Sequence, residues 1–342
     1  MALKPFGTTA GGEPVWLAEL NAGCISVEII TYGATIHRIL APDRRGDMAD
    51  VILGKDDLAG YAARGAPSAA FIGRVANRIK NHAFAMNGKK HVLEANEGST
   101  TLHSAGGNYA AKNFAVIEAG DAKLRLAARD LGEAGFPGEV SVEVLYTVDD
   151  DALTVEYCAI PTADTPINFT NHAYFNLAGQ DGGPVYGHTL TIDANFYTPS
   201  DKHDIPTGEI LKTAKTPFDF TKPRNLGEAM KELEYSGDRH NGFDHNYVLN
   251  GDGWRKVAQA SDESSGRILE IFTDLPGVQL YTANNIKEGT KGKGGATYQR
   301  HSGLCLETQF FPDSIHKPHF PGGIAMAYEL FSTATAYRFK AK

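Results

Sequence analysis

The chain has little cysteine and no long apolar run. Its three cysteines, Cys24, Cys158 and Cys305, are far apart and show neither the spacing of a metal site nor a disulfide framework. Reduced thiols in a cytoplasmic protein are the simplest interpretation. No stretch approaches the roughly 18 apolar residues of a transmembrane helix. The opening segment, MALKPFGTTAGGEP, also lacks the apolar core of a secretory signal. We therefore expect a cytoplasmic protein.

An excess of positive charge is also missing. The formal net charge of the 342 residues is −8, and no run of five like charges occurs. Proteins that bind nucleic acids or anionic membranes usually present a basic surface. We therefore expect neither of these partners.

Helical periodicity is scarce, and the best example is residues 226–235. Alternation with period two is far more common, and it is typical of half-buried strands. Residues 140–148 and 153–159 predict one hairpin, and residues 84–93 predict another, turning at Asn87-Gly88. Further strands are expected at 24–30, 123–127, 188–192, 267–272 and 278–282. No linker or repeat divides the chain, so residues 1–342 are predicted to form one large all-β domain of sandwich type.

Familiar cofactor and metal motifs are absent. Residues 251–256 fail the G-x-G-x-x-G pattern, and no G-x-S-x-G elbow occurs. The run KGKGG, residues 291–295, lacks the phosphate-loop spacing and is interpreted as a solvated loop. His316 and His319 have metal-like spacing, but Pro318 and Pro321 argue against a helix there. We expect no metal site and no cofactor.

Glu307 is the best single candidate for chemistry. It follows Leu304-Cys305-Leu306, and a carboxylate within an apolar run costs burial energy unless it is paired or used. His172 lies in TPINFTNHAYFNLAG, residues 165–179, among amides, hydroxyls and aromatic rings. Facing one another, a Glu and a His would supply a base and an acid.

Other polar candidates each have a bland alternative. Arg74 and Arg78 could be exposed charges. His103 and His172 could both be structural histidines in the core, and Asp244 could cap a turn. Together, however, arginine, amides, carboxylates, histidines and aromatic rings are the side chains that bind neutral sugars. The sequence therefore points to a carbohydrate site.

The same segments resemble the aldose 1-epimerases, also called galactose mutarotases. The resemblance covers roughly Tyr32 to Phe339, and seven motifs occur in the family's order. They are GRVANRI (73–79), TLH (101–103), GFPG (135–138), NFTNHAYFNLAG (168–179), FDHNY (243–247), PGVQLYT (276–282) and CLETQFFPDS (305–314).

This resemblance implies a β-supersandwich of large, mostly antiparallel sheets with few short helices. It implies an isomerase that needs no cofactor and interconverts the α and β anomers of free aldoses. Glu307 would be the general base and His172 the general acid, each with a pKa near its ordinary value. The monosaccharide would be held by residues at positions matching the family's: Arg78, His103 and Asp244, flanked by Asn77 and Gln279. The protein would act as a monomer or weak dimer.

Several alternatives stay open at this point. An enzyme acting on hexose 6-phosphates would need a cationic site, which Lys291 and Lys293 could supply. A non-catalytic sugar-binding module would not need both Glu307 and His172. A glycoside hydrolase would need a second carboxylate opposite Glu307. Glucose, galactose, xylose and arabinose are all possible substrates.

Overall fold

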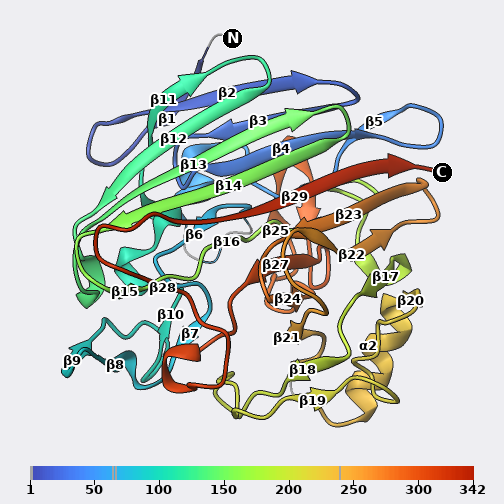
Figure 1. Ribbon diagram of the computed structural model, residues 1–342. Coiled ribbons are helices and arrows are strands. Elements are labelled where there is room, and N and C mark those ends of the chain that lie inside the picture. The colour runs from blue at the N-terminus through green and yellow to red at the C-terminus, as the bar shows by residue number, and fades with distance from the viewer. Residues whose placement is uncertain (1–2, 64, 66–67, 239) are drawn as a thin grey trace.

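β-Strands dominate the computed structural model, which describes residues 3–63, 65, 68–238 and 240–342 (Figure 1). Two α-helices occur in these ranges, α1 (Leu58–Ala62) and α2 (Leu226–Tyr235). The helix predicted at 226–235 is therefore confirmed. The side chain of Asn225 begins α2 by accepting a hydrogen bond from the backbone N–H of Glu228. Neither of these helices is long and apolar enough to cross a membrane.

A nine-stranded antiparallel sheet forms one layer. Its strands, in spatial order, are β11 (Ala115–Ala119), β12 (Lys123–Asp130), β13 (Val140–Asp149), β14 (Ala152–Pro161), β29 (Phe331–Ala341), β23 (Arg267–Thr273), β22 (Arg255–Ser261), β17 (Thr189–Ile192) and β20 (Arg224–Asn225). The strands expected at 123–127, 188–192 and 267–272 all lie in it, each within a few residues of its predicted bounds.

The predicted hairpin of residues 140–159 is the centre of this sheet. β13 and β14 pair without a break from Val140 opposite Pro161 to Asp149 opposite Ala152. Alternate residues of β13 are buried, as period two requires. Asp150, with a φ of 49°, and Asp151 make the turn between the strands.

Two five-stranded sheets cover the buried face of the large sheet. The first contains β1 (Lys4–Thr8), β2 (Pro14–Ala22), β3 (Ile25–Ile30), β4 (Thr35–Pro42) and β5 (Met48–Asp50) in chain order. The second has the order β19 (Leu211–Lys212), β18 (Phe196–Thr198), β21 (Asp244–Val248), β24 (Gly277–Tyr281) and β27 (Cys305–Gln309). The strands expected at 24–30 and 278–282 correspond to β3 and β24.

The core lies between these layers. β2 packs against β12 and β13, and β4 packs against β29. The second small sheet meets the large one where the hydroxyl of Thr308 bonds that of Thr335, at 2.5 Å. One apolar cluster runs from Ala18 to Phe339 and includes residues of all three sheets. The expectation of an all-β sandwich is therefore confirmed (Figure 1).

Short two-stranded pairs complete the structure. They are β6 (Phe71–Ile72) with β16 (Thr170–Asn171), β7 (Arg78–Ile79) with β10 (Thr101–Leu102), β8 (Ala83–Met86) with β9 (Lys89–Val92), β15 (Thr165–Pro166) with β28 (Ile324–Ala325), and β25 (Thr290–Lys291) with β26 (Thr297–Tyr298). The β8–β9 pair is the hairpin expected at 84–93. Asn87 and Gly88 have φ values of 51° and 73°, as a two-residue turn of this kind requires.

The interpretation of residues 291–295 as a solvated loop is wrong for Lys293. Its side chain is 2 % exposed. The ammonium lies 2.7 Å from Asp50 Oδ2 and donates to the backbone carbonyl of His37 at 2.6 Å. A buried lysine is tolerated when a carboxylate and a carbonyl replace its water. Lys293 therefore ties this loop to the first sheet instead of facing solvent.

Candidate active site

One face of the second small sheet carries three of the predicted site residues. Gln279 on β24 lies directly opposite Glu307 on β27, and Asp244 on β21 lies opposite Tyr281 on β24. Directly paired residues, and residues two apart on one strand, point to the same face of a sheet. Asp244, Gln279 and Glu307 therefore share one face although they come from three strands.

The remaining candidates come from the short pairs that border this face. Pairing of β6 with β16 places Asn171 opposite Phe71, and His172 follows at once. Pairing of β7 with β10 places Leu102 opposite Arg78. The backbone N–H of His103 then donates to the carbonyl of Asn77 at 2.8 Å.

These elements enclose a cleft of about 530 Å³. Six of the seven candidates line it: Asn77, Arg78, His103, His172, Asp244 and Glu307. Gln279 does not line the cleft, but it donates from Nε2 to Asp244 Oδ1 at 2.7 Å. Aromatic rings of Tyr32, Tyr61, Tyr174 and Tyr281 also line the cleft, which suits the apolar faces of a sugar.

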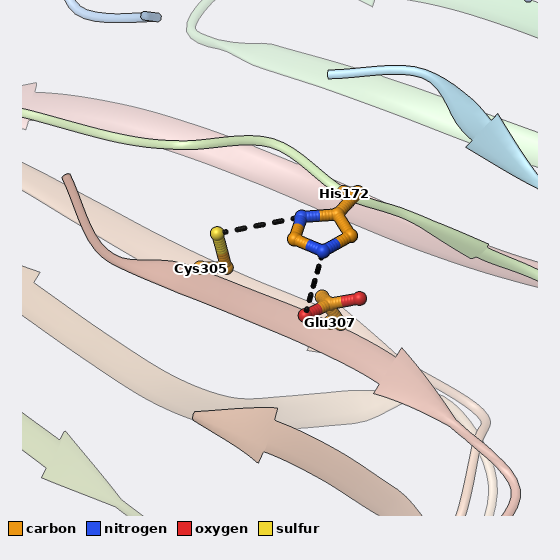
Figure 2. Close-up of side chains that lie close together, drawn as sticks. All are labelled: His172, Cys305 and Glu307. Carbon is orange, nitrogen blue, oxygen red and sulfur yellow. Dashed lines mark hydrogen bonds and ion pairs between the residues drawn. The ribbon is translucent and has the colours of Figure 1, made fainter. Parts of the chain in front are cut away.

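Glu307 and His172 face one another in the lining of this cleft. Their closest atoms, Oε1 and Nε2, are 3.7 Å apart (Figure 2). The side chain of Glu307 is 6 % exposed and that of His172 is 16 % exposed. At this distance a small reacting group could contact both side chains at once.

Burial moves the pKa values of these two groups in opposite directions. Burial, and then the charge of Asp244, raise the pKa of Glu307 well above its ordinary value, although Arg78 opposes this. Burial lowers the pKa of His172 to about 4, although its own carbonyl and Asp244 oppose the shift. The expectation of ordinary pKa values for both groups is therefore wrong, because both lose water on folding.

His103 is held as a neutral imidazole beside this pair. Its Nδ1 accepts a hydrogen bond from the backbone N–H of Asn77 at 3.1 Å, so the proton is on Nε2. Burial, and then His172 and Arg78, lower the pKa of His103 well below its ordinary value. The rings of His103 and His172 meet edge to face, with centroids 5.5 Å apart. His103 can therefore donate a hydrogen bond to a sugar hydroxyl.

Arg78 is held by two carboxylates that the sequence did not single out. Its Nε and Nη2 donate to Glu97 at 2.6 and 2.9 Å, and Nη2 lies 3.3 Å from Asp204. A bidentate carboxylate fixes the plane of a guanidinium group. These contacts leave Nη1 as the nitrogen best placed to meet a ligand. No sequence pattern around Glu97 or Asp204 predicts this contact, because each residue meets Arg78 only in the tertiary fold.

Arg74 does not lie in the cleft, and it is not an exposed charge. It is fully buried, and its Nη2 is 2.6 Å from Asp130 Oδ1. Its Nη1 and Nη2 also donate to the carbonyls of Pro137 and Gly138, at 2.7 and 3.0 Å. Arg74 is therefore a structural residue that holds the segment before Arg78 against β12.

Within the residues that the structure describes, two clusters of side chains have the composition of metal sites. In the first, Cys305 Sγ faces Nδ1 of His172 while Glu307 faces Nε2 (Figure 2). One ring nitrogen of His172, the Cys305 sulfur and a Glu307 oxygen lie within 4.8 Å of one another.

The second cluster is a network of ion pairs. His240 lies between Asp204, at 2.7 Å from Nε2, and Asp238, at 2.9 Å from Nδ1. Burial would lower the pKa of His240, but the two carboxylates raise it to about 9. Asp238 also meets His245, whose Nδ1 accepts from the backbone N–H of Asp244. At neutral pH His240 is therefore an imidazolium paired with two carboxylates.

Comparison with known proteins gives concordant matches over nearly the whole chain. A family model described as aldose 1-epimerase matches residues 17–338. The galactose mutarotase of Bos taurus is 41 % identical over 332 residues, covering 96 % of this chain and 95 % of the bovine protein. The aldose 1-epimerase of Haemophilus influenzae is 33 % identical, covering 96 % and 97 %. The crystal structure of an aldose epimerase homologue from C. elegans has a TM-score of 0.87 at 27 % identity, covering 95 % and 98 %.

Proposed function

Because the chain belongs to the aldose 1-epimerase family and is an aldose 1-epimerase, we propose that Glu307 and His172 exchange the anomers of a free aldose. The observation that carries this proposal is the Glu307–His172 pair, 3.7 Å apart in the lining of the cleft. Glu307 is the general base, and His172 is the general acid. The substrates are free aldoses such as glucose and galactose.

The reaction opens and recloses the sugar ring. The carboxylate of Glu307 takes the proton of the C1 hydroxyl, and imidazolium Nε2 of His172 gives its proton to the ring oxygen. The bond from C1 to the ring oxygen breaks, which leaves an aldehyde at C1. After rotation about the C1–C2 bond, the ring oxygen attacks the other face of the aldehyde. Each proton then returns to its donor, so nothing is consumed.

The opposed pKa values suit this exchange. A raised pKa makes the Glu307 carboxylate a stronger base, and a lowered pKa makes the His172 imidazolium a stronger acid. Burial also favours the uncharged pair, glutamic acid with neutral imidazole, which is the state that ring opening produces. Glu307 and His172 thus share one proton. Their observed pKa values describe the coupled pair and not either residue alone.

Arg78, His103 and Asp244 hold the sugar, with Asn77 and Gln279 at the flanks. Arg78 and His103 supply donors, while Asp244 accepts from sugar hydroxyls. Gln279 uses its amide to orient Asp244, and Asn77 orients His103 and the backbone of Arg78. Donors on one side and an acceptor on another suit a neutral polyol.

A hexose 6-phosphate is the less favoured substrate class. Lys293 is paired with Asp50, and Arg78 is already paired with Glu97 and Asp204. Asp244 also lines the cleft, and its charge would repel a phosphate dianion. A binding module without activity would have no use for the Glu307–His172 pair.

Three broader features belong to the same proposal. Residues 1–342 form a single domain, which is supported by the core cluster that runs from Ala18 to Phe339. The protein works as a monomer or weak dimer, since one chain supplies every proposed site residue. It acts in the cytoplasm, where its three free cysteines would stay reduced.

Polarimetry tests the proposal directly. Freshly dissolved α-D-glucose and α-D-galactose are expected to change optical rotation faster with the protein than without it. Glu307→Gln is expected to lose at least about 100-fold in kcat because the base is gone. Glu118→Gln, on the exposed strand β11, is the matched control and keeps full activity.

The outcomes separate the alternatives. Full activity of Glu307→Gln would remove Glu307 as the base. Acceleration with glucose 6-phosphate but with no free aldose would favour the phosphate-sugar enzyme. No acceleration with hexoses, pentoses or their phosphates would leave only the binding module.

A further inference from the structure

Cys305 lies on the other side of His172 from Glu307. Cys305 and Glu307 are both on β27, two positions apart, so their side chains point to the same face of the sheet. The sulfur of Cys305 is 3.6 Å from Nδ1 of His172, while Glu307 faces Nε2 (Figure 2). The imidazole is therefore held between two neighbours of one strand.

Cys305 does not line the cleft with the other site residues. Its relative exposure is 0 %, and it is absent from the residues that border the cavity. Burial, and then the charges of Glu307 and Asp244, raise the pKa of its thiol well above the ordinary value. Cys305 is thus a neutral thiol, which can neither contact the sugar nor act as a nucleophile in the cleft.

The proposed reaction requires Nδ1 of His172 to stay protonated. His172 gives a proton from Nε2 when the ring opens, and it takes a proton back at Nε2 when the ring closes. Nδ1 must therefore keep its own proton through both steps, since otherwise Nε2 would have no lone pair to receive one. A protonated Nδ1 in a buried site needs an acceptor.

The atoms around His172 can meet this demand. Its own carbonyl stabilises the imidazolium, as its effect on the pKa shows. The Cys305 sulfur is the side-chain atom that bonds Nδ1 in the described part of the chain. A thiol is a weak acceptor and carries no charge. It can hold the Nδ1 proton without stabilising the imidazolium as strongly as a carboxylate would.

We propose that Cys305 is a positioning residue, whose sulfur accepts the Nδ1–H of His172 and so keeps Nε2 as the nitrogen that exchanges a proton with the sugar. This inference rests on the proposed role of His172 as the acid. A carboxylate in this position would favour the charged imidazole and weaken it as an acid. The uncharged sulfur fixes the ring and its tautomer while leaving His172 acidic.

Other groups that face the His172 ring come from several elements. Glu307 and Asp244 carry charge, the Tyr174 ring stacks at 4.9 Å, and the His103 and Tyr281 rings meet it edge to face at 5.5 and 6.1 Å. All of these remain in a Cys305 variant. A change seen on replacing Cys305 therefore reports on the Nδ1 side of the ring.

Kinetics of Cys305→Ala and Cys305→Ser, measured by polarimetry, form the first test. Cys305→Ala is expected to lose roughly three- to tenfold in kcat with unchanged KM, because one weak hydrogen bond is lost outside the sugar contacts. Cys305→Ser keeps a hydroxyl acceptor and is expected to recover much of the loss. Cys158→Ala, a free cysteine on β14, is the matched control and keeps wild-type kcat.

Nitrogen-15 NMR of labelled histidines is the second test, with His172→Asn used to assign the signal. The neutral ring of the wild type is expected to carry its proton on Nδ1, and Cys305→Ala to populate the Nε2 tautomer. A wild-type ring with its proton on Nε2 would overturn the proposal. So would a Cys305→Ala protein with unchanged kcat and tautomer.

These failures are distinct from failure of the proposed function. If His172→Asn retains activity, His172 is not the acid, and the role of Cys305 falls with it. If His172→Asn is inactive while Cys305→Ala matches the wild type, only the positioning role is wrong.

Discussion

At the scale of single residues, Asp244 acts on the site in two ways. It lines the cleft, where we propose that it accepts from sugar hydroxyls, and Gln279 donates to one of its oxygens. Its charge also raises the pKa of Glu307, second to the effect of burial. In the proposed mechanism, one carboxylate would therefore couple binding to acid–base chemistry.

This coupling predicts the pH dependence of the reaction. In the proposed mechanism the active pair carries one proton, on His172 with Glu307 ionised, so kcat falls at low pH, where both groups are protonated, and at high pH, where both have lost their protons. The charge of Asp244 raises the pKa of both groups, so Asp244→Asn is expected to move both limbs of the kcat profile to lower pH. Polarimetry at saturating sugar across the pH range measures this shift.

Two results control this prediction. Asp252→Asn, at an exposed turn, is expected to leave the profile unchanged. A profile that stays in place in Asp244→Asn would mean that the charge of Asp244 does not set the pKa values of the pair. A profile moved to higher pH would contradict the assignment of Glu307 and His172 as the groups that titrate.

At the scale of elements, short strand pairs place three of the proposed site residues, and the large sheet supports them. β6–β16 places His172, and β7–β10 places Arg78 and His103. Each pair has only two residues per strand, so neither could form alone. Their geometry depends on the sheets and ion pairs around them.

α2 is an element that the site does not need. Its buried residues, including Leu226 and Leu233, pack into the core, and none of its residues lines the cleft. Asn225→Ala removes the N-cap and is expected to lower the free energy of unfolding by about 1 kcal/mol. Chemical denaturation measures the loss. An accompanying fall in kcat would show that α2 influences the active site.

At the scale of the whole molecule, one buried ion pair joins the site to the large sheet. Asp130, at the end of β12, accepts from Arg74 Nε and from the hydroxyl of Tyr109, at 2.8 and 2.9 Å. Arg74 also reaches the carbonyls of Pro137 and Gly138. The GFPG motif therefore contributes to a structural anchor four residues before Arg78.

This anchor makes stability depend on pH. Burial would raise the pKa of Asp130, but bonds from Arg74 lower it to about 2, below the reference value of 3.8. A depressed pKa adds stability above pH 3.8, and this is lost as the pH falls toward 2. The shift corresponds to about 2 kcal/mol.

Denaturation of Asp130→Asn at several pH values tests this anchor. The variant is expected to be less stable than the wild type at pH 7, because Arg74 keeps its buried charge without a counterion. The difference should shrink between pH 4 and pH 2. A difference that does not change with pH would mean that the ionisation of Asp130 contributes nothing.

Local patterns in the chain predicted part of the strands, but not β2, β4, β22 or β29. Alternation predicted the β13–β14 and β8–β9 hairpins, and the helix at 226–235 was found with its bounds. A polar residue in an apolar strand marked Glu307. Periodicity and turn chemistry act between neighbours, so they can be read without the fold.

Contacts between distant segments were decided only by the tertiary structure. Glu97 and Asp204 orient Arg78, Cys305 meets His172 across 133 positions, and Lys293 is buried against Asp50. The pKa values of Glu307 and His172 depart from their ordinary values for the same reason. Desolvation and charge act through space, so they depend on which segments the fold brings together. The sequence by itself determined which chemical groups and strands were present, and the packing of the three sheets decided their partners and their acidity.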